Sequence, residues 1–211
     1  MSLSFRVTDA KHEPYAAVPT LVFELELPGV GDFHHIALTS QIRIEPQRRE
    51  HGQDEASKLE ELFGHAKRWG DTQRPLLLCH ASLLITELDA RGRTTLPVPC
   101  TYDFEVAAVK YLHSLDDGEI PLVFLFSGTV FERAETGLRV SPIAWDREAR
   151  YRLPVKCWRA MMDHHYPGGG WLRLERETLD ALLRFKASRG LPTWDGALLA
   201  LLASDHGRDG R

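Results

Sequence analysis

The sequence predicts an α+β protein: an antiparallel, β-sandwich-like sheet with one inserted helix and a C-terminal helical segment. Two observations support this class. Apolar and polar residues alternate along several short stretches before residue 152, which is the period of half-buried strands. Apolar residues at 54–69 recur with helical spacing, and this spacing dominates after residue 152. We therefore expect a β-rich domain over 1–151 with an inserted helix at 54–69, a helical segment over 152–204 packed on it, and a frayed tail at 205–211.

The centre of the predicted sheet is a β-hairpin formed by residues 96–132. Alternation begins at Val98, and we expect this first strand to continue to residue 112. The Asp-Asp-Gly-Glu sequence at 116–119 supplies the turn, because Gly tolerates a positive backbone φ. Residues 122–131 are almost entirely apolar, so they predict the most buried strand of the chain.

Further strands are expected on both sides of this hairpin. Residues 20–27 and 33–44 alternate cleanly and are separated by a Pro-Gly turn, which predicts an antiparallel pair. Residues 75–87 are apolar on both faces, so this strand should lie inside the sheet. Shorter strands are predicted at residues 4–9 and 137–144.

The helix ends are predicted from capping preferences. Asp54 is a suitable N-cap for the inserted helix, and Gly70 is a suitable residue to end it. Pro154 fits the first turn of a helix that begins the C-terminal segment. Two more helices are expected over residues 176–186 and 194–202, the second capped by Thr193.

The bulk composition narrows the possible partners. The chain has 211 residues and a formal net charge of -4, and its Lys and Arg are not clustered, so we expect no nucleic-acid partner. The first residues lack a signal-peptide pattern, and no apolar run approaches the roughly 20 residues that span a bilayer, so no membrane association is expected. Three widely spaced cysteines predict no disulfide framework and favour a reducing cytoplasm.

Two groups of residues have the chemistry of metal ligands. His164 and His165 follow an aspartate at a predicted helix end, and imidazole with carboxylate suits zinc or iron. Adjacent helical positions diverge by about 100°, however, so the pair fits better as a C-terminal cap, where the helix dipole favours histidine. Cys79 and Cys100 could meet across paired strands, but two ordinary buried thiols are the simpler interpretation. We therefore expect no metal and no cofactor.

No motif predicts a catalytic residue. Ser127 precedes a glycine but lacks the G-x-S-x-G pattern of a nucleophile elbow, and Gly128 fits a bulge or close packing in a crowded strand. The three glycines at 168–170 lack the spacing and the lysine of a phosphate-binding loop. Asp103 and Glu105 share one strand face, where a solvated pair is more common than an acid–base pair.

A partner-binding surface is expected at one of two places. The charged stretch at 45–55 contains Arg48, Arg49 and His51, and it reads as a solvated loop or a docking surface. The corner that follows the predicted helix end carries Tyr166 and Trp171. Aromatic residues there could form a groove for a partner, although core packing is their more common role.

Three passages carry a resemblance to a known family. They are PCTYDFEVAAVKYLHSL with DGEIPLVFLFSGTVF, then LPVKCWRAMMDHHYPGGGWLRLERETLDAL, then RFKASRGLPTWDGALLALL. Together they resemble an uncharacterised bacterial family whose genes often lie among those of [NiFe] hydrogenases. The resemblance implies a cytoplasmic accessory role for a redox enzyme, and it assigns no catalytic or binding residue.

The function expected from these observations is that of a non-enzymatic accessory or interaction protein. It would assist the assembly or maturation of a redox complex such as a [NiFe] hydrogenase, with hydrogenase subunits or maturation factors as its partners. A ligand- or metal-binding module is the first alternative. A hydrolase-like enzyme is the second, and it needs dispersed polar residues such as His80, His113 or Asp103 to converge in one pocket.

Overall fold

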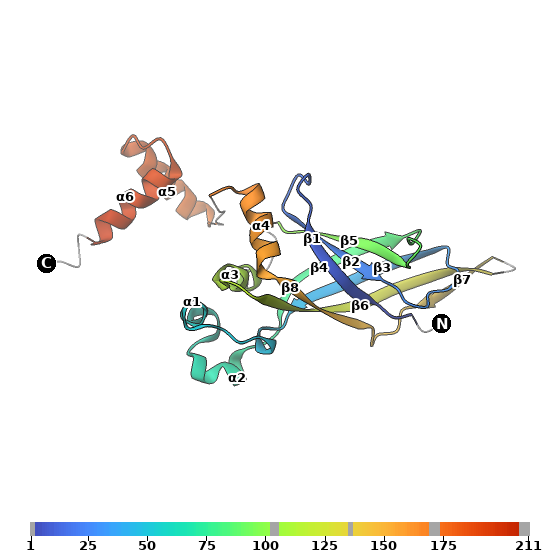
Figure 1. Cartoon of the computed structure of the whole chain (residues 1–211). Coiled ribbons are helices and arrows are strands. Elements are labelled where there is room, and N and C mark those ends of the chain that lie inside the picture. The colour runs from blue at the N-terminus through green and yellow to red at the C-terminus, as the bar shows by residue number, and fades with distance from the viewer. Residues whose placement is uncertain (1–2, 102–105, 135–136, 169–173, 207–211) are drawn as a thin grey trace. The chain divides into compact units, whose positions relative to one another are not determined.

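The computed structural model describes residues 3–101, 106–134, 137–168 and 174–206. The chain divides into two compact units, Met1–Gly169 and Gly170–Arg211, and each unit is described by itself. Two antiparallel sheets make up most of the first unit (Figure 1). Strands and helices together give the α+β class that the sequence predicts.

The smaller sheet has the strand order β1-β2-β5. The larger sheet has the order β4-β3-β6-β7, and β8 also pairs with β6. The strand bounds are β1 (Arg6–His12), β2 (Thr20–Glu26), β3 (His35–Ile44), β4 (Leu76–Ile85), β5 (Arg93–Pro99), β6 (Glu119–Ala134), β7 (Gly137–Pro142) and β8 (Glu148–Pro154).

The core lies between the two sheets. Phe23 on β2 meets Phe124 on β6 edge to face, with ring centroids 5.0 Å apart. Phe5, just before β1, stacks on Phe126 at 4.3 Å. Alternate residues of β2 and β3 are buried, as their sequence pattern predicts. The architecture is therefore sandwich-like, with one face of each sheet turned inward.

Helices cover one end of the sandwich. They are α1 (Gln53–Phe63), α2 (Trp69–Thr72), α3 (Val106–Ser114) and α4 (Val155–His165), with 3-10 turns η1 (Pro46–Arg48) and η2 (Ala66–Arg68). Helix α1 packs on α3, and α4 packs on β1 and β2. The second unit contains α5 (Arg176–Ser188) and α6 (Trp194–His206), and none of the described helices is long and apolar enough to cross a membrane.

The predicted central hairpin is wrong in its first strand. The strand ends at Pro99, residues 102–105 lie outside the described part, and α3 forms over residues that were expected to be extended. Helix α3 buries Ala108, Tyr111 and Leu112, which have i, i+3 and i+4 spacing. A short stretch that is apolar on both faces satisfies either a strand or a helix, so local pattern could not decide between them. The second strand, β6, is confirmed.

Two predicted strand placements are also wrong. Strands β2 and β3 lie in different sheets instead of forming a hairpin, and β4 lies at the edge of its sheet instead of inside it. Strand β8 was not predicted. Its last residues were assigned to the helical segment, because Pro154 marks the start of the next helix. Periodicity reveals which face of a strand is buried, but it does not reveal the strand's neighbour.

The inserted helix is shorter than predicted. It begins after Gly52 and ends at Gly64, whose positive φ of 73° suits a C-terminal glycine. Trp69 lies in a separate short helix, and its indole N–H donates to the Gly64 carbonyl at 2.7 Å. In the second unit, Thr193 caps α6 as predicted, because its Oγ1 accepts the Gly196 N–H at 3.1 Å. Packing of residues 176–204 on the sheet stays a prediction.

Gly128 is the tightest backbone position in the larger sheet. Its φ is +139°, and a Cβ added there would lie 2.0 Å from the Ala37 carbonyl oxygen of β3. We expect Gly128→Ala to lower the free energy of unfolding by about 3 kcal/mol or more, because backbone strain and a backbone clash add. Gly137 has a similar φ of +131° with open space around it, so Gly137→Ala should cost only about 1–2 kcal/mol of strain. If urea unfolding showed the same loss of unfolding free energy for both variants, the clash with Ala37 would be unimportant.

Candidate functional site

The two histidines at the end of α4 bind a loop of the sandwich. The Nε2 atom of His164 lies 2.8 Å from the Pro14 carbonyl oxygen. The Nε2 atom of His165 lies 3.2 Å from the Ala16 carbonyl oxygen, and its Nδ1 lies 3.1 Å from the Met161 carbonyl oxygen. A carbonyl oxygen only accepts, so in each such hydrogen bond the donor is the ring N–H. The two histidines thus hold the β1–β2 loop against α4.

Tyr15 lies between the two held carbonyls, and its side chain projects into solvent. It is 95% exposed, and Val18 on the same loop is 38% exposed. The loop is closed behind them, because the Glu13 N–H donates to the Thr20 carbonyl at 2.9 Å and the Ala16 N–H donates to the Glu13 carbonyl at 3.3 Å. We call the surface formed by Tyr15, Val18, His164, His165 and Tyr166 the Tyr15 corner.

The electrostatics at the Tyr15 corner come from histidines and a helix end. The His164 ring lies 5.2 Å from the His165 ring and 6.0 Å from the ring of His12 on β1. The Met161 carbonyl that His165 Nδ1 approaches lies in the last turn of α4, near the end where carbonyl groups lack partners within the helix. The histidines therefore form the C-terminal cap that the sequence suggests. The same two side chains also bind the β1–β2 loop.

Most ring nitrogens of His164 and His165 lie against backbone carbonyls. Three of them bond to backbone carbonyls, which leaves few lone pairs for a metal ion. In the part of the chain that the structure describes, no group of three or more His, Cys, Asp and Glu side chains is arranged to hold a metal.

The cysteines are free thiols in the described structure. Burial raises the pKa of Cys79 and of Cys100 to about 12, so both stay protonated at neutral pH. A protonated thiol is a poor nucleophile and a poor metal ligand. The two residues therefore have the character of packed side chains.

The charged loop at 45–55 holds a buried ion pair. Arg49 Nη2 lies 2.5 and 2.7 Å from the two carboxylate oxygens of Glu55, and the side chains are only 10% and 6% exposed. Arg49 Nη1 also donates to the Glu119 carbonyl at 3.2 Å, while Glu55 accepts the Asp116 N–H at 2.8 Å. The side chain of Arg49, expected at a partner surface, is instead mostly buried, because its guanidinium joins separate segments of the chain.

Arg48 and His51 flank this ion pair. Arg48 is half-exposed, and its Nε lies 2.8 Å from a Glu45 carboxylate oxygen. His51 Nε2 lies 3.0 Å from the hydroxyl of the buried Tyr111, and its ring meets Trp69 edge to face. Burial, followed by the positive charge of Arg49, lowers the pKa of His51. His51 therefore favours the neutral form and packs against the helices that cover this end.

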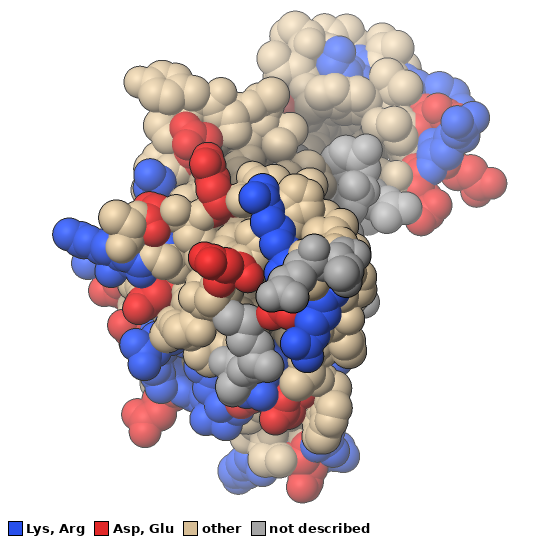
Figure 2. Space-filling model, turned by 90° about the vertical axis from the view of Figure 1, so that its right-hand side faces the viewer, with Lys and Arg blue, Asp and Glu red and all other residues tan. Residues whose placement is uncertain are grey.

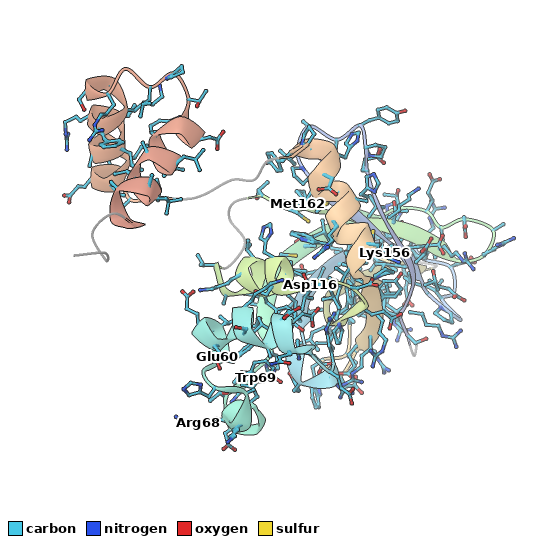
Figure 3. The ribbon with its side chains drawn as sticks, turned by 60° about the vertical axis from the view of Figure 1, so that its left-hand side comes forward. Glu60, Arg68, Trp69, Asp116, Lys156 and Met162 are labelled. Atoms are coloured by element: carbon cyan, nitrogen blue, oxygen red, sulfur yellow. The ribbon has the colours of Figure 1, made fainter. Side chains whose placement is uncertain are left out.

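Salt bridges continue outward from the buried pair. Asp116 lies between α1 and α4, where Lys58 Nζ approaches it to 2.8 Å and Arg159 Nη2 to 3.3 Å (Figure 3). On the side of the protein drawn in Figure 2, basic side chains lie next to acidic ones. Arginines of the larger sheet are paired in the same way, for example Arg150 with Glu148 at 2.7 Å. Most of these arginines thus form ion pairs with carboxylates.

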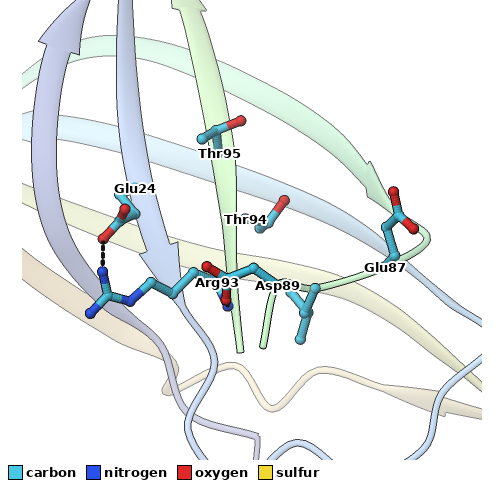
Figure 4. A pocket seen from close by; sticks show the side chains of 7 residues that line it. Glu24, Glu87, Asp89, Arg93, Thr94 and Thr95 are labelled. Atoms are coloured by element: carbon cyan, nitrogen blue, oxygen red, sulfur yellow. Dashed lines mark hydrogen bonds and ion pairs between the residues drawn. The ribbon is translucent and has the colours of Figure 1, made fainter. Parts of the chain in front are cut away.

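An open cavity of about 520 Å³ lies beside β2 and β5 (Figure 4). Arg93 Nη1 there bonds to a Glu24 carboxylate oxygen at 2.7 Å. The N–H groups of Arg93 and Arg91 both donate to Asp89, and the bond from Arg93 is the main reason that the pKa of Asp89 is lowered. Several polar groups of this cavity therefore already form hydrogen bonds within the turn that connects β4 and β5.

His80 and His113, two of the residues suggested for a hydrolase, lie on different elements and do not converge. His80 lies on the outer side of β4 and contacts Gln41 at 3.1 Å. His113 lies on α3 beside Trp158, in a groove of about 300 Å³ between α3 and α4. Asp103 and Glu105 lie outside the described residues.

The sequence indicated only part of the Tyr15 corner. Tyr166 was singled out as a partner-surface candidate and the two histidines as a helix cap, and Trp171 lies outside the described residues. Tyr15 and Val18 were missed, because they lie about 150 residues away along the chain and only the packing of α4 on β1 brings them near. Their local signal was a tyrosine and a valine in a proline-bounded loop, which is typical of any surface turn.

The buried ion pair gives a stability prediction. Glu55→Gln should lower the free energy of unfolding by about 3–5 kcal/mol, because Arg49 is left buried without its counter-charge. Lys58→Ala removes a pair that is about half exposed, so it should cost at most about 1 kcal/mol. Urea unfolding of both variants measures the difference. A small loss for Glu55→Gln would mean that water reaches Arg49.

The histidine contacts give a second prediction. His165→Ala removes both side-chain bonds of this residue, so amide hydrogen exchange should speed up at residues 16–18. His65→Ala is the control, since that histidine is 83% exposed and pairs only with Glu60 in the described structure. Unchanged exchange in the first variant would show that backbone bonds alone hold the loop.

A model of a family of unknown function, DUF6084, matches residues 1–209. No curated protein matches the chain. Because the family model extends over nearly the full sequence, the chain belongs to the family of unknown function DUF6084.

Proposed function

We propose that this protein is a non-enzymatic accessory protein that binds another protein through the Tyr15 corner. The observation that carries the proposal is a tyrosine with 95% of its surface exposed, held between two backbone carbonyls that histidines bind. A large aromatic ring at a loop tip contributes nothing to the core at this exposure. Its rigid, amphipathic ring is instead typical of residues that dominate protein interfaces.

Preorganisation strengthens this interpretation. Ordering a flexible loop on binding costs free energy, and a loop that is already held avoids most of that cost. Here the bonds from His164 and His165 lie on either side of Tyr15, at Pro14 and Ala16. The ring can therefore enter a partner's apolar pocket with little further ordering.

The chemistry around Tyr15 describes the partner's surface. Ala17 and Val18 are exposed beside it, and the Glu13 carboxylate lies within 3.4 Å of the Tyr15 backbone N–H. A partner that presents an apolar pocket with a polar rim would match this surface. The resemblance noted above makes hydrogenase subunits and maturation factors the first partners to test, in an assembly or maturation role.

The dispersed polar residues also favour binding over chemistry. His80 and His113 lie on different elements, and both Cys79 and Cys100 are held in the protonated form by burial. For the described residues, the alternatives of a hydrolase or a metal-binding module have no comparable arrangement of side chains to support them.

Site-specific photo-crosslinking tests the proposal. A benzophenone amino acid is placed at position 15, or at the exposed position 65 as a control, in a host that expresses a [NiFe] hydrogenase. Position 15 should crosslink to a hydrogenase subunit or a maturation factor, and position 65 should not. Equal crosslinking from both positions, or none to these proteins from position 15, would contradict the proposal.

The identified complex then allows a quantitative measurement. Tyr15→Ser should weaken it at least about thirtyfold, since a central aromatic anchor is worth about 2 kcal/mol or more. Thermal unfolding should be unchanged, because the side chain is exposed. His65→Ala serves as the matched control and should leave the affinity unchanged.

A further inference from the structure

Strand β7 is the last strand on one side of the larger sheet. It lies at the end of the first unit that is away from helices α1 to α4 (Figure 1). Its inner neighbour is β6, and among the described residues no strand pairs with its outer side. Such an edge leaves backbone N–H and C=O groups unpaired, and the structure complementary to them is another extended chain.

Every second residue of β7 turns its backbone groups outward. The Ile143 N–H, directly after β7, donates to the Gly128 carbonyl of β6 at 2.9 Å. Bonded positions alternate in an antiparallel pair, so the next residue along, Pro142, belongs to the outward set. Leu138 and Val140 belong to the same set, and each directs its N–H and its C=O away from β6. A proline fits an outward position because it has no N–H to donate to the sheet.

The core-facing side of this edge borders a cavity. The row Ile85–Ile36–Val130 is buried, and Val130 pairs with Ser141 of β7, so a residue added opposite Ser141 would continue the row. A cavity of about 80 Å³ lies there, with an apolar lining from Leu3, Val30, Val130 and Ile143. Its volume is about that of three water molecules, which is room for one aliphatic side chain.

Arginines give this edge a preference for negative charge. Arg139, on the same face as Ser141, is 72% exposed, and its Nε lies 3.7 Å from a Glu132 carboxylate oxygen. Arg133 pairs with Leu138 on the other face, and it is exposed without a carboxylate partner among the described residues. A carboxylate opposite Arg139 would form a closer, charge-assisted contact, whereas a basic residue there would meet repulsion.

An exposed edge by itself is common, because every open sheet has two. Strand β7 differs because a cavity, exposed aliphatic side chains and an available arginine lie on one short strand. Leu138 is 54% exposed and Val140 is 57% exposed. A second copy of the chain fits this edge poorly. If Leu138 of one copy lay opposite Val140 of the other, the two Arg139 side chains would face each other, which is unfavourable.

We propose that β7 binds an extended segment of another protein as an additional antiparallel strand, the direction of every pairing in this sheet. The segment carries an aliphatic residue opposite Ser141 and, two positions later, an acidic residue opposite Arg139. Backbone hydrogen bonds to Leu138 and Val140 supply affinity, while the cavity and the arginine select the sequence. This surface is distinct from the Tyr15 corner, so the two proposals can fail independently.

A capped peptide, Thr-Val-Leu-Val-Glu-Val-Thr, tests this inference on the full chain. Its leucine lies opposite Ser141 and its glutamate opposite Arg139 in the proposed register. In an NMR titration, the amide signals of Leu138 and Val140 should shift saturably, and hydrogen exchange at both should slow. Replacing the glutamate with lysine should weaken binding at least about fivefold, because like charges then lie opposite each other.

Methylated peptides make the test specific to strand addition. The central valine lies opposite Val140, so a methyl group on its amide nitrogen removes a hydrogen bond to β7. That change should weaken binding at least about tenfold. A methyl group on the amide nitrogen of the neighbouring glutamate points away from β7, so it is the matched control and should change binding less than about twofold.

Charge reversal tests the role of the arginine. Arg139→Glu should prefer the lysine peptide to the glutamate peptide, whereas Arg91→Glu, on the exposed turn before β5, should keep the original preference. Urea unfolding verifies that both variants are folded.

Three results would each overturn the proposal. They are the absence of saturable shifts at Leu138 and Val140 up to about 1 mM peptide, equal effects of the two methyl groups, and an unchanged preference in Arg139→Glu. Shifts at the same two amides that depend on chain concentration without peptide would identify a second copy as the occupant, and they would overturn it too.

Discussion

Backbone pairing of β6 is the interaction on which the structure depends. This strand of 16 residues pairs with β3 along one side, and with β8 and then β7 along the other. Its inward side chains reach the core through Phe124 and Phe126, so one segment sets both the register of the larger sheet and its contact with the smaller one. Gly128 permits the close approach of β3 at the centre of this pairing.

The ion pair of Arg49 and Glu55 has a similar organising role at the end of the sandwich. Because it joins the 45–55 loop, α1 and the turn before β6, the helices there are tied to the central strand. The Tyr15 corner is separate from this network and depends on α4, whose final histidines reach the β1–β2 loop.

Sequence patterns predicted local features better than contacts. Alternation identified β2 and β3, a continuous apolar run identified β6, and proline located the start of α4. Helix α3 was missed because Ala107–Leu112 is apolar in a way that fits two periods, and the buried positions of α3 are selected by packing on α1. For the candidate site, His164 and His165 were recognised as a helix cap, whereas the loop that they hold was not.

The sequence by itself determined the α+β class, the buried face of most strands and the positions of several helix ends, because these follow from residue spacing and backbone preferences within a few residues. The tertiary structure decided which strands are neighbours, that the Arg49 side chain is mostly buried, and that Tyr15 stands exposed beside His164 and His165. These facts depend on contacts between segments up to 150 residues apart. Each such contact is selected by the combined packing of the whole core, which no local pattern records.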